Sequence, residues 1–185
     1  MDERAIIQGC RAGNRDAQRA LYELFADRIY SLLRRITRDE HAAFDLAQDT
    51  FMRAFERIGE FEGRSGLGTW LYRIATNQAL QWLRKRRTER RHEERIARDR
   101  RSGNHEDEPA YDLENGLLRL SEQHRLILLL RYHEELSYDE IAGILEVSPG
   151  TVASRLNRAR EELRKILLEQ RGACAEEKPD AARPK

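Results

Sequence analysis

The chain has 185 residues, of which 39% are hydrophobic and 36% are charged, with a formal net charge of +1 at pH 7. This composition suits small helical domains with narrow apolar stripes better than one large core. The near-neutral charge argues neither for nor against a nucleic-acid partner, and no apolar run is long enough to insert into a membrane.

Apolar residues recur at intervals of three and four rather than two, which predicts helices and no strands. In the N-terminal half we expect helices at residues 3–12, 16–37 and 40–58. A loop with four glycines, GEFEGRSGLG, occupies residues 59–68, and a fourth helix starts near residue 69 and reaches residue 87 or beyond. These helices form a predicted N-terminal domain, residues 1–100.

A linker is predicted at residues 101–112, where Gly, Asn, Pro and acidic residues follow an arginine-rich stretch. A C-terminal domain then covers residues 113–170, with helices expected at 113–120, 122–132, 138–145 and 149–170. Residues 171–185 are rich in Ala, Glu and Pro and are expected to be disordered. The predicted fold is therefore all-α, with two small helical domains joined by a flexible linker.

The stretch from residue 136 to residue 167 has the pattern of a helix-turn-helix. Ser137 and Glu140 form a capping box for the first helix, and Ser148 followed by Pro149 starts the second. The second helix places arginines between its apolar residues, so it can bury one side and offer the other to a DNA major groove. An ordinary helical hairpin with a solvated basic face is the alternative.

Aromatic residues gather around the glycine loop and the basic helix after it. Phe61, Trp70, Tyr72 and Trp82 would simply be core residues in most proteins. Next to a run of Arg and Lys, however, such residues can also stack on unpaired bases while the cations hold phosphates. The glycine loop could then wrap an extruded base.

The helix around residues 45–55 is amphipathic. Phe44, Ala47, Phe51, Ala54 and Phe55 fall near one face, and polar residues fall mostly on the other. The pattern is typical of a core helix with a solvated back. It also fits a polar surface that docks a partner helix through complementary charge.

No constellation in the sequence indicates an enzyme, a metal site or a cofactor. The five histidines are scattered, and no phosphate-binding glycine loop follows a strand. Cys10 and Cys174 fit no metal spacing and are expected to be free thiols. The N-terminus lacks the features of a signal peptide, so we expect a cytoplasmic protein.

Three blocks in order resemble the extracytoplasmic-function (ECF) family of bacterial RNA polymerase sigma factors. The blocks are DLAQDTFMRAF (45–55), TWLYRIATNQALQWLRKRR (69–87) and the region from LRLSEQ to RAREEL (118–163). The resemblance covers nearly all of residues 5–170. It implies a promoter-specificity subunit that binds core polymerase, recognises the −35 and −10 elements and helps to melt the −10 DNA.

The resemblance also implies three sets of contact residues. Contacts to the clamp helices of the largest polymerase subunit are expected from Asp45, Gln48, Asp49, Phe51 and Arg53. Contacts to the −10 element are expected from Phe61, Arg64, Trp70, Tyr72, Arg73, Asn77, Gln81, Arg84, Lys85 and Arg86. Contacts to the −35 element are expected from Ser148, Thr151, Ala153, Ser154, Arg155 and Arg158. Residues 113–132 would face the flap of the second-largest subunit, and an anti-sigma factor is a further expected partner.

Two positions depart from the family pattern. Ala153 stands where the family often has a basic residue, which indicates a distinct −35 preference, and Gln81 stands where it often has Asp. The competing hypothesis is a stand-alone helix-turn-helix regulator with an N-terminal sensing or dimerisation domain. The aromatic and basic content of residues 69–87 argues against it, because a sensing domain has no use for that combination.

Overall fold

The computed structural model describes residues 2–97 and 113–176. Every regular element in these two ranges is helical, as the apolar periodicity predicted, and no strand occurs in them. No helix in the same ranges combines the length and the apolar character needed to cross a bilayer. The predicted linker and the last nine residues lie outside the described ranges.

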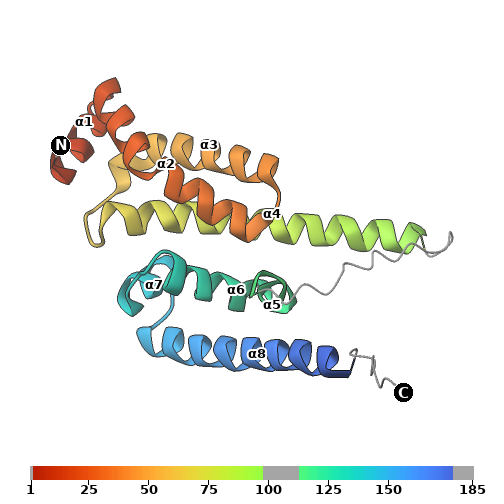
Figure 1. The fold of residues 1–185 in the computed structure, drawn as a ribbon. Coiled ribbons are helices and arrows are strands. Elements are labelled where there is room, and N and C mark those ends of the chain that lie inside the picture. Colours follow the sequence, from red (N-terminus) through yellow and green to blue (C-terminus); the bar gives the residue numbers. More distant parts are fainter. Residues whose placement is uncertain (1, 98–112, 177–185) are drawn as a thin grey trace, which may run out of the picture.

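Three long helices form the N-terminal bundle, with a short helix at one end (Figure 1). Its elements are α1 (Glu3–Arg11), α2 (Arg15–Thr37), α3 (Glu40–Arg57), the 3-10 turn η1 (Ile58–Glu60) and α4 (Leu67–Ala97). The side chain of Asn14 accepts hydrogen bonds from two amides at the start of α2, and the side chain of Asp39 accepts one from the Ala42 amide at the start of α3. Helix α4 begins at Leu67, inside the stretch that the sequence predicted as loop.

The core of this bundle is built from the apolar stripe of α2. Leu21, Ile29, Leu32 and Leu33 are fully buried, and α2 packs against both α3 and α4. A polar contact between α3 and α4 lies inside the bundle, where the Gln78 amide donates to the Thr50 hydroxyl over 3.0 Å. Because a buried polar group must find a partner, this bond helps to fix α3 against α4.

Five further elements form the C-terminal domain. They are α5 (Leu113–Arg119), α6 (Glu122–Leu128), the π-helical turn η2 (Leu129–His133), α7 (Tyr138–Leu145) and α8 (Pro149–Glu176). The sequence predicted one continuous helix over residues 122–132, whereas the structure widens its last turn into η2. Helix α8 continues to Glu176, past the predicted end at residue 170.

The helix-turn-helix consists of α7 and α8, and the predicted capping box is confirmed. The Ser137 hydroxyl accepts from the Glu140 amide over 3.2 Å, and the Glu140 carboxylate accepts from the Ser137 amide over 2.8 Å. Val152, Leu156 and Ala159 of α8 are fully buried. Helix α8 packs on α6 and α7, which leaves its opposite face open.

Replacing Ser137 with alanine should lower the free energy of unfolding by about 1 kcal/mol, the usual effect of losing such a cap. Urea denaturation followed by circular dichroism measures the change. Ser154→Ala is the matched control, since Ser154 lies in the second turn of α8, is exposed and bonds only to a carbonyl of its own helix. An equal loss in both variants would contradict the capping role.

The two domains lie against each other, which the sequence did not predict. The C-terminal helices run along α4, with α8 on the far side of α6 and α7 (Figure 1). Helix α7 packs on α4, and the Arg125 guanidinium of α6 donates to the Ile36 carbonyl at the end of α2 over 3.3 Å. The contact between α7 and α4 lies on the part of α4 that carries several predicted DNA-binding residues.

Candidate nucleic-acid interface

The aromatic residues at the start of α4 are buried. Phe61, Trp70 and Tyr72 are exposed by 5%, 8% and 1%, and the Phe61 and Trp70 rings lie 5.4 Å apart between centroids. In this conformation they are core residues, which is one of the two roles that the sequence allowed. They support the surface around them and do not offer a free ring face to a base.

A polar pocket of about 250 Å³ opens beside these aromatics. It brings Arg73, Asn77 and Gln81 of α4 together with Arg53 and Arg57 of α3. Asn77 and Gln81 lie four residues apart, so they share a face of α4. Amide and guanidinium groups around a small cavity can hydrogen-bond the edges of an unstacked base. We call this cavity the α4 pocket.

Arg57 of the α4 pocket was missed in the sequence analysis. It lies at the last position of α3, outside the motif that carried the resemblance, and it pairs with the exposed carboxylate of Glu60 at 2.8 Å. Nothing local in the sequence distinguishes it from other surface arginines. Only the packing of α3 on α4 brings it to the pocket.

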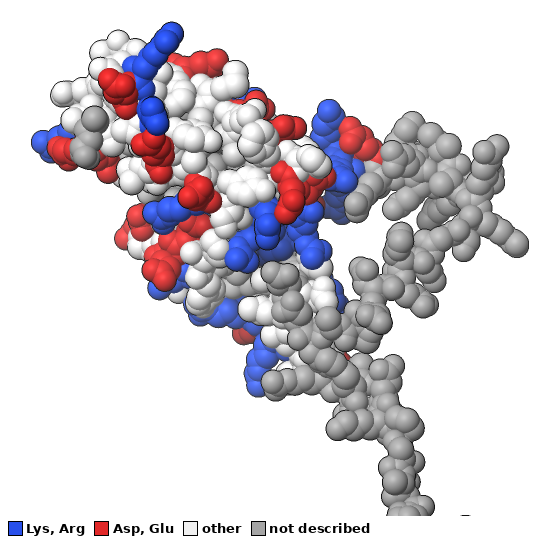
Figure 2. Space-filling view, turned by 45° about the horizontal axis from the view of Figure 1, so that its top comes forward, with Lys and Arg blue, Asp and Glu red and all other residues white. Residues whose placement is uncertain are grey.

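The cations at the basic end of α4 differ in exposure and in their partners, and the exposed Lys85 lies 3.9 Å from Glu89 on the same helix. Arg84 and Lys85 are exposed, whereas Arg86 lies 2.7 Å from Asp39 and over the Trp82 ring at 4.8 Å. The Ala42 amide and then Arg86 lower the pKa of Asp39 below its usual value. Figure 2 shows basic and acidic groups side by side on the visible face, in keeping with a net charge of +1.

The open face of α8 carries the residues predicted to read the −35 element. Ser148 and Thr151 form the N-cap, since the Ser148 hydroxyl accepts from the Thr151 amide over 3.1 Å. Arg155 and Arg158 make no hydrogen bond or ion pair with another described residue, so both guanidiniums are available to a ligand. Ala153 is half-buried between them and the cap.

Helix α3 presents a polar surface away from the bundle. Asp45, Gln48, Asp49 and Arg53 are exposed there, as predicted. Phe51 is 4% exposed, and its ring lies at a tilt against Tyr22, with 4.8 Å between the centroids. Phe51 therefore orients the helix from inside.

Two large apolar side chains of α3 face solvent. Phe44 and Met52 are 54% and 60% exposed. The sequence pattern predicted Phe44 on the apolar face of this helix, with the core residues, and this prediction is wrong.

A cluster around the buried carboxylate of Glu134 joins the two domains. The Tyr72 hydroxyl of α4 donates to the carboxylate of Glu134, whose side chain is 2% exposed. Arg28 of α2 lies 3.6 Å from the same carboxylate, and His133 Nδ1 lies 2.8 Å from its other oxygen. Burial, and then the Glu134 carboxylate, raise the pKa of Tyr72 above its usual value. We call these four residues the interdomain cluster.

A second contact between the domains reaches the α4 pocket. Glu146, in the turn between α7 and α8, lines the pocket and lies 3.5 Å from the Arg73 guanidinium. A carboxylate therefore occupies the position beside Arg73 that a phosphate would need. The C-terminal domain covers one edge of the predicted −10 surface in this conformation.

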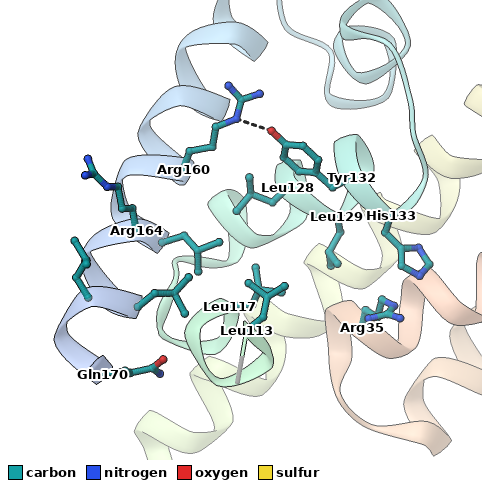
Figure 3. Close-up of a pocket in the computed structure, with 13 residues that line it drawn as sticks. Arg35, Leu113, Leu117, Leu128, Leu129, Tyr132, His133, Arg160, Arg164 and Gln170 are labelled. Atoms are coloured by element: carbon teal, nitrogen blue, oxygen red, sulfur yellow. Dashed lines mark hydrogen bonds between the residues drawn. The ribbon is translucent and has the colours of Figure 1, made fainter. Parts of the chain in front are cut away.

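An apolar groove of about 880 Å³ runs between α8 and the helices α5 and α6 (Figure 3). Figure 3 shows Leu113, Leu117 and Leu128 in its floor, with Arg164 at its edge, and Arg160 Nε donates to the Tyr132 hydroxyl over 2.6 Å. An apolar channel with cations at its rim fits an amphipathic helix with acidic flanks.

Two family profiles match the chain. Sigma-70 region 2 matches residues 21–89, and Sigma-70 region 4 matches residues 111–163. The first match runs from residue 21 of α2 to residue 89 of α4, and the second runs from residue 111 to residue 163 of α8.

Curated proteins resemble the chain over most of its length. The ECF RNA polymerase sigma factor SigW of Bacillus subtilis (strain 168) is 32% identical over 176 residues, covering 87% of this chain and 94% of SigW. The RNA polymerase sigma factor YlaC of the same strain is 36% identical over 167 residues, covering 85% of this chain and 96% of YlaC.

Solved structures show the same arrangement of helices. CnrH, solved in complex with the cytosolic domain of CnrY, has a TM-score of 0.68 and 25% identity, covering 89% of this chain and 96% of CnrH. The sigma factor RpoE, solved with the anti-sigma factor NepR from Bartonella quintana, has a TM-score of 0.61 and 26% identity. The match covers 80% of this chain and 95% of RpoE.

Proposed function

This chain belongs to the ECF sigma factors and directs transcription initiation, and we propose that it reads the −10 element with the α4 pocket and the −35 element with the open face of α8. The observation that carries the proposal is the presence of these two surfaces on separate domains. A stand-alone regulator needs only the second of them. Sigma factors are non-catalytic, so this chain contributes binding energy and the polymerase performs nucleotidyl transfer.

The α4 pocket supplies the groups that trap an unstacked −10 base. Opening duplex DNA costs a few kcal/mol per disrupted step, which contacts to an extruded base must offset. Asn77, Gln81 and Arg73 provide amide and guanidinium partners for a base edge and a phosphate. Arg84 and Lys85 extend the basic surface along the unpaired DNA strand, because both are exposed on the same helix.

Helix α8 anchors the protein on the −35 element. Arg155→Ala should weaken binding by about 1–3 kcal/mol and relax the base preference at one position, as expected for a guanidinium that reads a base edge. Fluorescence anisotropy with a set of single-substitution duplexes measures both effects. An equal loss of binding affinity for every duplex would identify a phosphate contact instead. Arg164→Ala, on the same helix near the groove, is the control.

The two domains must separate before both elements are bound. The −35 and −10 elements are centred about 25 base pairs apart, which is roughly 85 Å along B-form DNA. In the described conformation Glu146, two residues before the N-cap of α8, contacts Arg73 in the α4 pocket at 3.5 Å. This contact and the interdomain cluster together hold a closed form that core polymerase and DNA have to open.

The remaining surfaces are assigned to protein partners. The polar face of α3, with Phe44 and Met52 beside it, docks the clamp helices of the largest polymerase subunit. The apolar groove of Figure 3 accepts a helix from the flap of the second-largest subunit. Because RpoE was solved with an anti-sigma factor, a regulator of that kind is a further proposed partner.

Transcription with purified core enzyme tests the proposal. Core enzyme plus this chain should initiate at specific sites in a promoter library, whereas core enzyme alone should not. A lack of stimulation on every member of the library would contradict the function. A helix-turn-helix regulator would instead bind duplex DNA tightly without polymerase, which a gel-shift assay with and without core enzyme distinguishes.

A further inference from the structure

Helix α1 lies at the same end of the N-terminal bundle as the loop that precedes α4 (Figure 1). It is outside the segment that matches Sigma-70 region 2, which begins at residue 21. Its apolar side attaches it to the bundle through Ile6 and Cys10, which are 3% and 4% exposed. A Cβ added at Gly9 would lie only 2.4 Å from the Cβ of Ala17, so α1 and α2 approach as closely as glycine allows.

The polar side chains of α1 reach both ends of the 61–66 loop. At the first end, Arg11 Nε donates to the Ile58 carbonyl over 3.3 Å, and its Nη2 donates to the Phe61 carbonyl. At the other end, the Leu67 amide donates to the Glu3 carboxylate over 3.0 Å. Gly66 precedes α4 and has no side chain to cap it, so Glu3 supplies the missing acceptor.

The tip of the loop has few bonds of its own. Its side chains are exposed, and its ion pair, Arg64 to Glu62 at 2.6 Å, joins two side chains that are 85% and 63% exposed. Gly63 has a φ of +72°, a backbone conformation that glycine adopts at little cost. The loop therefore has two fixed ends and an open tip.

We propose that Glu3 and Arg11 are positioning residues for −10 recognition, holding both ends of the 61–66 loop in the shape that receives an unstacked base. Neither residue needs to touch DNA. A loop that is already ordered loses less conformational freedom when it binds, so part of the binding energy remains for strand opening. This inference rests on the proposed −10 role of the loop and α4.

The test compares Arg11→Met and Glu3→Gln with Arg4→Met in holoenzyme assembled with core polymerase. Arg4 is exposed on the same helix and makes no hydrogen bond or ion pair with another described residue. A promoter is first selected from a library with the unmodified protein. Permanganate reactivity of −10 thymines then measures strand opening on that promoter and on versions with single −10 substitutions.

We expect Arg11→Met to reduce opening about tenfold, since it removes two charge-assisted bonds, and Glu3→Gln to reduce it less. The ratio of opening between the selected and the substituted −10 elements should fall toward one, while core affinity and −35 duplex binding stay unchanged. A purely structural role would weaken all of these together. If Arg11→Met discriminates between the selected and the substituted −10 elements as well as Arg4→Met does, the inference is overturned.

Loop order is measured separately, without DNA or polymerase. In a Cys174→Ser background, where the remaining native thiol of Cys10 is only 4% exposed, a spin label on Ser65→Cys should become more mobile when Arg11→Met is added and should not respond to Arg4→Met. Unchanged mobility would contradict the positioning role even if opening fell. If the unmodified holoenzyme selects no promoter at all, the proposed function fails. If the unmodified holoenzyme selects a promoter, and Arg11→Met and Glu3→Gln open that promoter as Arg4→Met does, only the positioning role fails.

Discussion

Replacing Glu134 with alanine should release the C-terminal domain from α4 and make the free protein more extended. The change removes a buried carboxylate that accepts from the Tyr72 hydroxyl and lies 3.6 Å from Arg28. A hydrogen bond to a charged group contributes about 1.5–3 kcal/mol, so the ratio of closed to open protein should fall at least tenfold. Small-angle X-ray scattering of the free chain measures the radius of gyration directly.

The same variant should also engage promoter DNA more readily. Opening removes Glu146 from Arg73 and uncovers the α4 pocket, so holoenzyme should form open complexes at a lower concentration of the variant. Glu134 is not one of the predicted DNA contacts, which keeps this measurement interpretable. Asp139→Ala is the control, because Asp139 is exposed on α7 and has no bond to another described residue. Equal radii for both variants would contradict the role of the cluster.

Reversing the charge of Asp49 should weaken binding to core polymerase by about 30-fold or more. Asp49 is exposed in the middle of the polar face of α3 and has no bond to another described residue, so arginine there should leave the fold intact. Placing a like charge in a complementary interface costs about 2 kcal/mol or more. Microscale thermophoresis with labelled core enzyme measures the dissociation constant.

Asp27→Arg provides the matched control for this experiment. Asp27 is an exposed acid on α2, outside the predicted docking surface, and its replacement changes the net charge by the same amount. The control should bind core enzyme like the unmodified chain. If both variants lose affinity equally, the effect comes from overall charge. If neither loses affinity, α3 is not the docking surface.

The helices could be predicted because their signals are local. The spacing of apolar residues at three and four identified every long helix. The capping residues Ser137 and Ser148 predicted where α7 and α8 begin. The missed features lie at helix ends. The last turn of α6 widens into η2, where the amides of Glu134 and Leu136 bond to carbonyls five and six residues back. No residue type by itself specifies such a turn.

The candidate site could be predicted only in part. Asn77, Gln81 and Arg73 were identified from one motif, and the structure places them in one pocket, since they share a helix face. Arg57 was not identified, because it reaches that pocket from a different helix. Tyr72 was identified as a DNA contact, yet its hydroxyl is bound to Glu134, 62 residues away in the chain.

The sequence by itself determined that the chain is helical, which faces of its helices are apolar, where the helix-turn-helix starts, and to which family the chain belongs. These properties depend on residues within a few turns of one another. Only the tertiary structure decided that the domains close on each other, that Phe44 and Met52 face solvent, and that Glu3 and Arg11 hold the loop before α4. With 34 basic and 33 acidic residues, each charge has many possible partners, and only the packing of distant helices selects among them.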